Sequence, residues 1–142
     1  MGNICRSPAA ECLFRTALEE KDVSHSFTLD SAGTGGWHIG NPPDQRMRAA
    51  AQKQGLEITG SARQISANDL TSFDWIFCMD KDNLEDVIAM GGNPETTTLL
   101  LTFTGNNEIS EVPDPYYGGD DGFDCVIALI NESVRTLATM LS

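Results

Sequence analysis

Residues 73–92 read "FDWIFCMDKDNLEDVIAMGG", and this stretch joins two kinds of secondary structure. Its first part, 73–80, is aromatic and apolar enough to form a buried strand. Its second part, 81–92, has the pattern of the helix that follows such a strand. A strand that leads directly into a helix is the unit of α/β folds, so we expect the rest of the chain to alternate between strands and helices as well.

The flanking segments continue the alternation of helices and strands. Ser7 and Pro8 are a good N-cap and first helical residue, so a helix is expected to begin there. The sequence predicts further strands at 27–33 and 96–103, a surface loop at 35–44, and a helix over 44–55 that Gly55 closes. The last helix is the clearest, because one apolar stripe runs through Phe123, Val126, Ile127, Ile130, Val134, Leu137, Ala138 and Leu141.

This order predicts an α/β fold: a doubly wound parallel sheet of about four strands with helices on both faces. The chain has the length of one domain, residues 1–142, and its sequence contains no repeat or linker. In such sheets a ligand lies beyond the carboxyl ends of the strands, where loops lead into helices. Candidate functional residues are therefore expected at that edge.

Composition excludes several classes of partner. The formal charge of −12 argues against nucleic acid or an anionic membrane surface. No apolar run is long enough to span a bilayer, and no secretory signal opens the chain, so a cytoplasmic protein is expected. The four cysteines and two histidines lack metal-binding spacing, and we expect no metal or other cofactor. Cys78 and Cys125 are expected to be reduced, buried thiols.

The segment "GNICRSP" (2–8) has the parts of a phosphate site. Gly2 and Asn3 tolerate positive φ, so the backbone can curl into a nest of inward-pointing N–H groups. The helix that begins at Ser7 adds its positive end, and Arg6 can hold two oxygens of a tetrahedral oxyanion. An ordinary turn before a capped helix, with an exposed arginine, stays open as the alternative.

A resemblance to a known family adds to this reading. "GNICRSPAAE" (2–11) resembles the active-site loop of the low-molecular-weight protein tyrosine phosphatases, and the likeness continues through 30–44, "ARQI" (62–65), 73–83 and "DPYYGG" (114–119). The resemblance implies a hydrolase of phosphate monoesters that forms a cysteinyl-phosphate intermediate. It also implies substrates among phosphotyrosine proteins or small aryl phosphates, and binding of inorganic phosphate or similar oxyanions.

The resemblance also assigns roles to residues. Arg6 and Ser7 would be catalytic, within a phosphate-binding loop of Gly2, Asn3, Ile4, Cys5, Arg6 and Ser7. Asp114 resembles the general acid, whereas Asp120, Asp121 and Asp124 are read as a solvated acidic cluster at the start of the last helix. The aromatic rim of the cleft would consist of Trp37, Tyr116 and Tyr117. Arg63 would brace the loop below the site, and Ser31 would support Asn3.

One element of the family pattern falls outside this chain. The family loop is Cys-x5-Arg-Ser, and six residues before Arg6 is the position just before Met1. The family's first, central strand would also precede Met1. We therefore expect that Met1 is an internal methionine of a longer protein, that the 142-residue chain is itself inactive, and that a slot is left in its core.

Two alternatives differ in chemistry. An arsenate reductase would need a resolving cysteine pair between Cys78 and Gly92, where only Cys78 is present. A non-enzymatic phosphate-binding or interaction module would keep Arg6 and the nest without turnover. The "DPYY" motif favours a phosphatase over a reductase, and the missing nucleophile keeps the binding module open.

Overall fold

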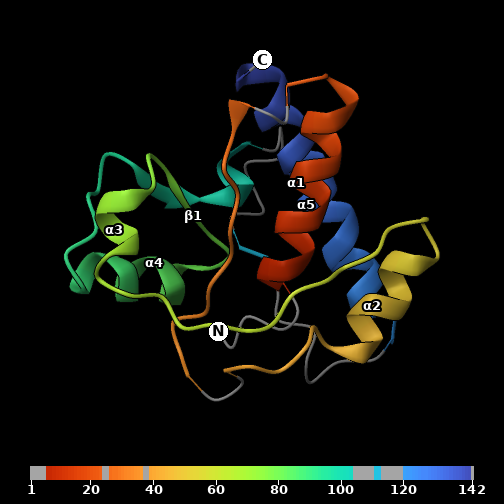
Figure 1. The fold of residues 1–142 in the computed structure, drawn as a ribbon, viewed down its shortest axis with the longest axis horizontal. Helices are drawn as coiled ribbons and strands as arrows, with labels where there is room; N and C mark the ends of the chain where they lie inside the picture. The colour runs from red at the N-terminus through yellow and green to blue at the C-terminus, as the bar shows by residue number, and fades with distance from the viewer. Residues whose placement is uncertain (1–5, 24–25, 37–38, 104–110, 113–119, 142) are drawn as a thin grey trace.

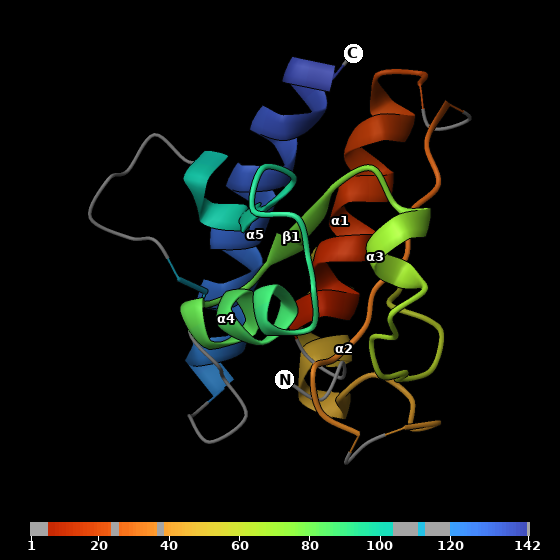
Figure 2. The same ribbon diagram turned by 90° about the vertical axis from the view of Figure 1, so that its left-hand side faces the viewer.

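Helices cover a small parallel sheet from both sides (Figure 1). This computed structural model describes residues 6–23, 26–36, 39–103, 111–112 and 120–141. In both views α1 and α5 lie on one side of β1, and α4 lies on the other (Figure 2). In chain order the elements are α1 (Arg6–Glu20), α2 (Gln45–Gln52), α3 (Asp69–Ser72), β1 (Ile76–Cys78), α4 (Lys81–Ala89), β2 (Thr97–Leu99), the 3₁₀ helix η2 (Leu100–Phe103) and α5 (Asp120–Leu141).

The core forms where α1 and α5 pack together. Seven of the eight residues of the expected α5 stripe are buried, from Phe123 to Ala138, and they meet the apolar face of α1. Leu141, the eighth, is 40% exposed at the helix end, so its expected burial was wrong. Burial of this stripe removes large apolar side chains from water and so stabilises the packing of the helix pair.

The sheet confirms the α/β class and its parallel pairing. β1 and β2 run parallel, with Ile76 beside Thr97 and Cys78 beside Leu99. Gly33 and Gln64 form an isolated parallel bridge. The expected strand over 96–103 ends early, because Leu100 and Leu101 turn into η2 and are both buried. A helical turn directs neighbouring side chains toward one side, whereas a strand would point them to opposite faces.

The segment expected as a strand at 27–33 is not a strand along its length. Only Gly33 bridges to a neighbour, although the exposure of Ser26 to Ser31 alternates as in a strand. Phe27 and Leu29 pack against the core. The residues have the strand pattern, but a strand also requires a hydrogen-bonded neighbour.

Local capping sets the helix ends. Asp44 caps α2, because its Oδ1 accepts hydrogen bonds from the N–H groups of Arg46 (2.8 Å) and Met47 (3.4 Å). Beyond α4, the Gly91 N–H donates to Ile88 O and the Gly92 N–H donates to Val87 O, each at 3.0 Å. This is a Schellman motif, and Gly91 has the positive φ of 108° that it requires.

We expect Gly91→Ala to destabilise the fold by about 1 kcal/mol, because alanine is strained in the left-handed conformation. The measurement is the free energy of unfolding in urea. Gly91→Asn is the matched variant and should lose less, since asparagine tolerates this conformation. Equal stability of the alanine variant and the parent chain would contradict the assignment of this cap.

The cysteine expectations have a mixed outcome. Cys78 is buried as expected, and burial, with a smaller contribution from the charge of Asp80, raises the pKa of its thiol to about 12. Cys125 is exposed, so the expectation that it is buried was wrong. It lies beside the stripe residues Val126 and Ile127 but on the outer face of α5. None of the described helices combines the length and apolarity needed to cross a membrane.

Candidate active site

Arg6 is a buried cation at the start of α1, and it is held by two acceptors. One terminal nitrogen of its guanidinium donates to Asp80 Oδ2 at 2.6 Å and to the Val112 carbonyl at 2.8 Å. The residue is only 4% exposed. The exposed arginine of the ordinary-turn alternative is therefore wrong, whereas the turn itself lies outside the described residues.

Asp80 lies just beyond the carboxyl end of β1 and accepts hydrogen bonds from two residues. Its Oδ2 accepts from Arg6, and its Oδ1 accepts from the Asn83 N–H at 2.8 Å as the N-cap of α4. Burial works against ionisation, but the Asn83 N–H and the Arg6 guanidinium outweigh it, so the pKa of Asp80 lies below its ordinary value. The carboxylate is therefore ionised at neutral pH and neutralises part of the charge of Arg6.

Residues 111–112 are hydrogen-bonded to the turn between β1 and α4. The Val112 N–H donates to Met79 O at 2.7 Å, and Glu111 Oε2 accepts from the Lys81 N–H at 2.9 Å. Val112 is buried. Together with the Arg6 contact to the Val112 carbonyl, these bonds join α1, the β1–α4 turn and the 111–112 segment at one point.

The beginning of α1 provides a second source of positive potential. Ser7 lies in the first turn beside Arg6, and the N–H groups of a first helical turn have no partners within the helix. Their dipoles add to the guanidinium charge, so this end of α1 attracts anions. The position agrees with the rule that ligands lie beyond the carboxyl ends of parallel strands.

Arg63 links two further segments. Its guanidinium contacts Asp69 at 2.9 Å and Asp30 at 3.1 Å, and the Arg63 carbonyl accepts from the Gly33 N–H at 2.9 Å. The hydrogen bond from Arg63 is the main reason that the pKa of Asp69 is lowered. Arg63 thus ties 30–33 to α3, which is compatible with the bracing role that the sequence suggested.

The structure describes only part of the expected site. Arg6 and Ser7 lie together at the start of α1. Outside the described residues lie Gly2, Asn3, Ile4, Cys5, Trp37, Asp114, Tyr116 and Tyr117, so their roles stay predictions. Among the described residues no cluster of His, Cys, Asp or Glu could hold a metal ion.

Comparison with known proteins shows to which family this chain belongs. The family model for low molecular weight phosphotyrosine protein phosphatase matches residues 1–142. The chain belongs to this phosphatase family. A relative from Schizosaccharomyces pombe, a low molecular weight phosphotyrosine protein phosphatase, is 40% identical over 99% of this chain and 92% of its own length. The human protein of that name is 38% identical over 89% of this chain and 82% of its own length.

Solved structures of phosphatases superpose closely on this chain. A protein tyrosine phosphatase from Entamoeba histolytica, with Hepes in its active site, superposes with a TM-score of 0.94 at 33% identity, over 99% of this chain and 92% of that one. YfkJ from Bacillus subtilis gives a TM-score of 0.91 at 37% identity, over 99% and 89% of the respective chains. The resemblance stated from the sequence is therefore confirmed.

Sequence reasoning missed Asp80 and Glu111 as parts of this phosphatase-family site. Asp80 had a usable signal, because an aspartate between an apolar run and a helix pattern is both an N-cap and a group at the carboxyl end of a strand. Glu111 had none, since its contact with Lys81 spans 30 residues.

Acid should weaken this phosphatase-family fold through Asp80 and Asp69. Both carboxyls have pKa values lowered in the folded state, so their stabilisation is complete above the unfolded pKa of about 3.9 and is lost as the pH falls through the folded values. We expect the free energy of unfolding in urea to fall below about pH 4. Asp80→Asn should lower stability at pH 7 and flatten this acid slope, and an unchanged slope would contradict the assignment.

Proposed function

We propose that this protein is a phosphotyrosine protein phosphatase, which hydrolyses aryl phosphate monoesters through a cysteinyl-phosphate intermediate. The observation that carries the proposal is the placement of Arg6. Its buried guanidinium lies at the start of α1, beyond the carboxyl end of β1, and is fixed by Asp80 and Val112. Family membership gives this arrangement its chemical context.

In this proposal the loop from Gly2 to Ser7 binds the transferring phosphoryl group. Arg6 and the backbone N–H groups would stabilise the charge on its equatorial oxygens, and Ser7 would donate a hydrogen bond to the attacking thiolate. A buried cation already positioned by hydrogen-bond partners needs little rearrangement when charge develops on the phosphate. This preorganisation is what makes such groups effective in catalysis.

Asp114 would be the general acid, which protonates the leaving phenolate and then activates water against the phosphocysteine. Residues 111–112, just before Asp114 in the sequence, are hydrogen-bonded to the β1–α4 turn. The segment that contains Asp114 therefore begins at a fixed position. Trp37, Tyr116 and Tyr117 would border the cleft and stack on the aryl group. The substrates would be phosphotyrosine proteins or small aryl phosphates in the cytoplasm, with inorganic phosphate as product.

The attacking cysteine would stand six residues before Arg6, just ahead of Met1. The intact mass of the native protein, isolated from its source, tests this directly. A mass above that of Met1–Ser142 by about one strand's worth of residues supports a cysteine phosphatase. A mass that matches Met1–Ser142 would leave the chain without an attacking group, and the phosphatase proposal would fail.

The second candidate is a phosphate-binding module without turnover, because the buried Arg6 at the start of α1 would attract an oxyanion without any attacking group. Phenyl phosphate separates the two functions. A phosphatase releases phenol in repeated turnovers, whereas the module binds the oxyanion and releases none. The names of the relatives favour a phosphatase over an arsenate reductase.

A further inference from the structure

Residues 111–112 lie beside the turn after β1, and in the described part of the chain two hydrogen bonds join them to it. The Val112 N–H donates to the Met79 carbonyl at 2.7 Å. The Glu111 carboxylate accepts from the Lys81 N–H at 2.9 Å. The first bond joins two backbones, whereas the second depends on one side chain. The Glu111 side chain therefore supplies one of these two attachments.

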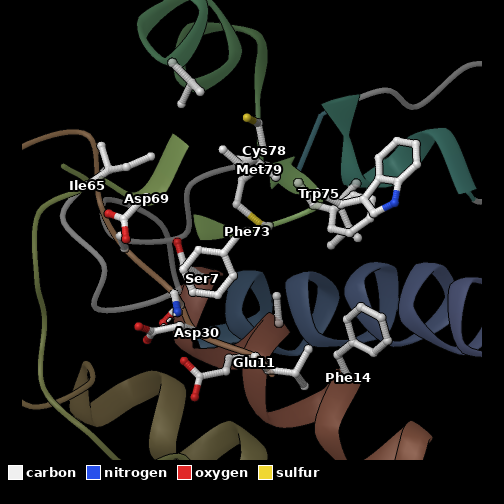
Figure 3. Close-up of a pocket in the computed structure, with 18 of the residues that line it drawn as sticks. Ser7, Glu11, Phe14, Asp30, Ile65, Asp69, Phe73, Trp75, Cys78 and Met79 are labelled. Atoms are coloured by element: carbon white, nitrogen blue, oxygen red, sulfur yellow. Dashed lines mark hydrogen bonds between the residues drawn. The ribbon is translucent and has the colours of Figure 1, made fainter. Parts of the chain in front are cut away.

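Arg6 contacts the same turn from α1. Figure 3 shows Cys78 and Met79, at the end of β1, facing α1 across a pocket. Arg6 is the first residue of α1, and its Nη1 donates to Asp80 Oδ2 at 2.6 Å and to the Val112 carbonyl at 2.8 Å. The 111–112 segment thus connects directly to the guanidinium through the Val112 carbonyl.

These two acceptors determine the orientation of a planar group. Nη1 of an arginine carries two N–H groups, so acceptors on both sides of it fix the plane and the rotation of the guanidinium. With Asp80 alone, the group could turn about a single hydrogen bond. The direction of the guanidinium is important because its contact with a tetrahedral oxyanion is two-pronged. The position of the Val112 carbonyl therefore affects how Arg6 can meet a phosphate.

We propose that Glu111 is a positioning residue of the phosphate site. It holds Val112 against the turn, and the Val112 carbonyl holds the Arg6 guanidinium in the direction that binds an oxyanion. This inference rests on the proposed function, because it takes Arg6 as a ligand of the phosphate. Glu111 acts through Val112 and does not itself contact the phosphate. Its side chain is exposed, so its substitution removes no core packing.

The negative charge of Glu111 would have the opposite effect on phosphate binding. A carboxylate near an anion site repels the anion, so removal of the charge alone should strengthen binding slightly. Removal of the hydrogen bond to the Lys81 N–H should weaken binding, because Val112 loses an attachment and Arg6 loses its fixed direction. The sign of the change in affinity therefore separates a positioning residue from an ordinary surface charge.

Calorimetric titration of the 142-residue chain with inorganic phosphate tests the proposal. Glu111→Ala should weaken phosphate binding by about fivefold, because small errors in the placement of a binding group are costly. Glu111→Gln removes the charge but keeps an oxygen that accepts from the Lys81 N–H, so its affinity should equal that of the parent or exceed it by less than about twofold. Glu85→Ala is the matched control: it removes an exposed carboxylate from α4 and should not weaken binding.

The same substitution in an Arg6→Lys protein shows whether Glu111 acts through Arg6. A lysine ammonium has no planar fork to orient, so Glu111→Ala should there change phosphate affinity by less than about twofold. Circular dichroism verifies that each variant folds. A general disturbance of the site would give the same fivefold loss in both backgrounds and would overturn the proposal.

Two other results would also overturn it. One is a Glu111→Ala variant that binds phosphate as tightly as the parent, and the other is a Glu111→Gln variant that loses as much affinity as the alanine variant. A parent chain that binds no phosphate gives a different result from these. In that case the phosphate site of the proposed function fails, and the role of Glu111 fails with it.

Discussion

Replacing Arg6 by alanine should lower the affinity of the protein for inorganic phosphate by about 100-fold. Two charge-assisted hydrogen bonds to a bound oxyanion together contribute about 3 kcal/mol, and each 1.4 kcal/mol is a factor of ten. Calorimetric titration of the 142-residue chain measures this loss. Arg6→Lys should recover only part of the affinity, because a lysine ammonium cannot form the planar two-pronged contact.

The same substitution should also weaken the fold. Asp80 would keep its charge but lose its cation, and breaking a largely buried ion pair costs about 3 kcal/mol. The double variant Arg6→Ala, Asp80→Asn should lose less than the sum of the two single variants. Arg15→Ala is the matched control: it breaks the exposed Arg15–Glu11 pair and should change stability by less than about 0.5 kcal/mol. Strict additivity would mean that Arg6 and Asp80 do not act as a pair.

Asp114→Asn should lower the turnover of phenyl phosphate by about 10² to 10³-fold in a protein that carries the proposed attacking cysteine. Phenolate is a poor leaving group unless it is protonated as it leaves. Loss of the proton donor should therefore slow the first chemical step, in which phenol is released. The dependence of kcat/KM on the leaving-group pKa should steepen, since substrates with acidic phenols need little protonation. Steady-state rates with a series of substituted phenyl phosphates measure both effects.

Asp124→Asn is the control for this prediction, because Asp124 lies near the start of α5 and is expected to be a solvated surface charge. Asp124 forms a partly exposed pair with Lys53, and its substitution should leave the leaving-group dependence unchanged. If Asp124→Asn reproduced the effect, or if Asp114→Asn left the slope unchanged, Asp114 would not be the proton donor. If the parent protein itself showed no turnover, the phosphatase proposal would fail before either comparison.

The parts of the fold that the sequence predicted are those set by local pattern. The α5 stripe from Phe123 to Ala138 has a helical period over several turns, and its burial follows from that period. The helix expected over 44–55 is observed as Gln45–Gln52, and the helix expected to begin at Ser7 begins one residue earlier, at Arg6; both depend on a few neighbouring residues. Local signals suffice for such features because the physical cause is itself local.

The expectations that failed depend on distant partners. Strand pattern in 27–33 could not show whether a neighbouring strand is present, and the leucine run at 99–101 could not show that α5 draws Leu100 and Leu101 out of the sheet. In the site, Arg6 was identified from its own loop. Its partners Asp80 and Val112 were not, because nothing near Arg6 in the sequence indicates them.

The hydrogen bonds of Arg6 limit how early in synthesis its site can form. They bridge 74 residues to Asp80 and 106 residues to Val112, so most of the chain must be made before both bonds can form. Contacts of such long range form only after the intervening chain has been ordered. A nascent chain that has released only α1 from the ribosome would therefore carry Arg6 without its anchors. Its capacity to hold an oxyanion should arise late, after residue 112 has emerged.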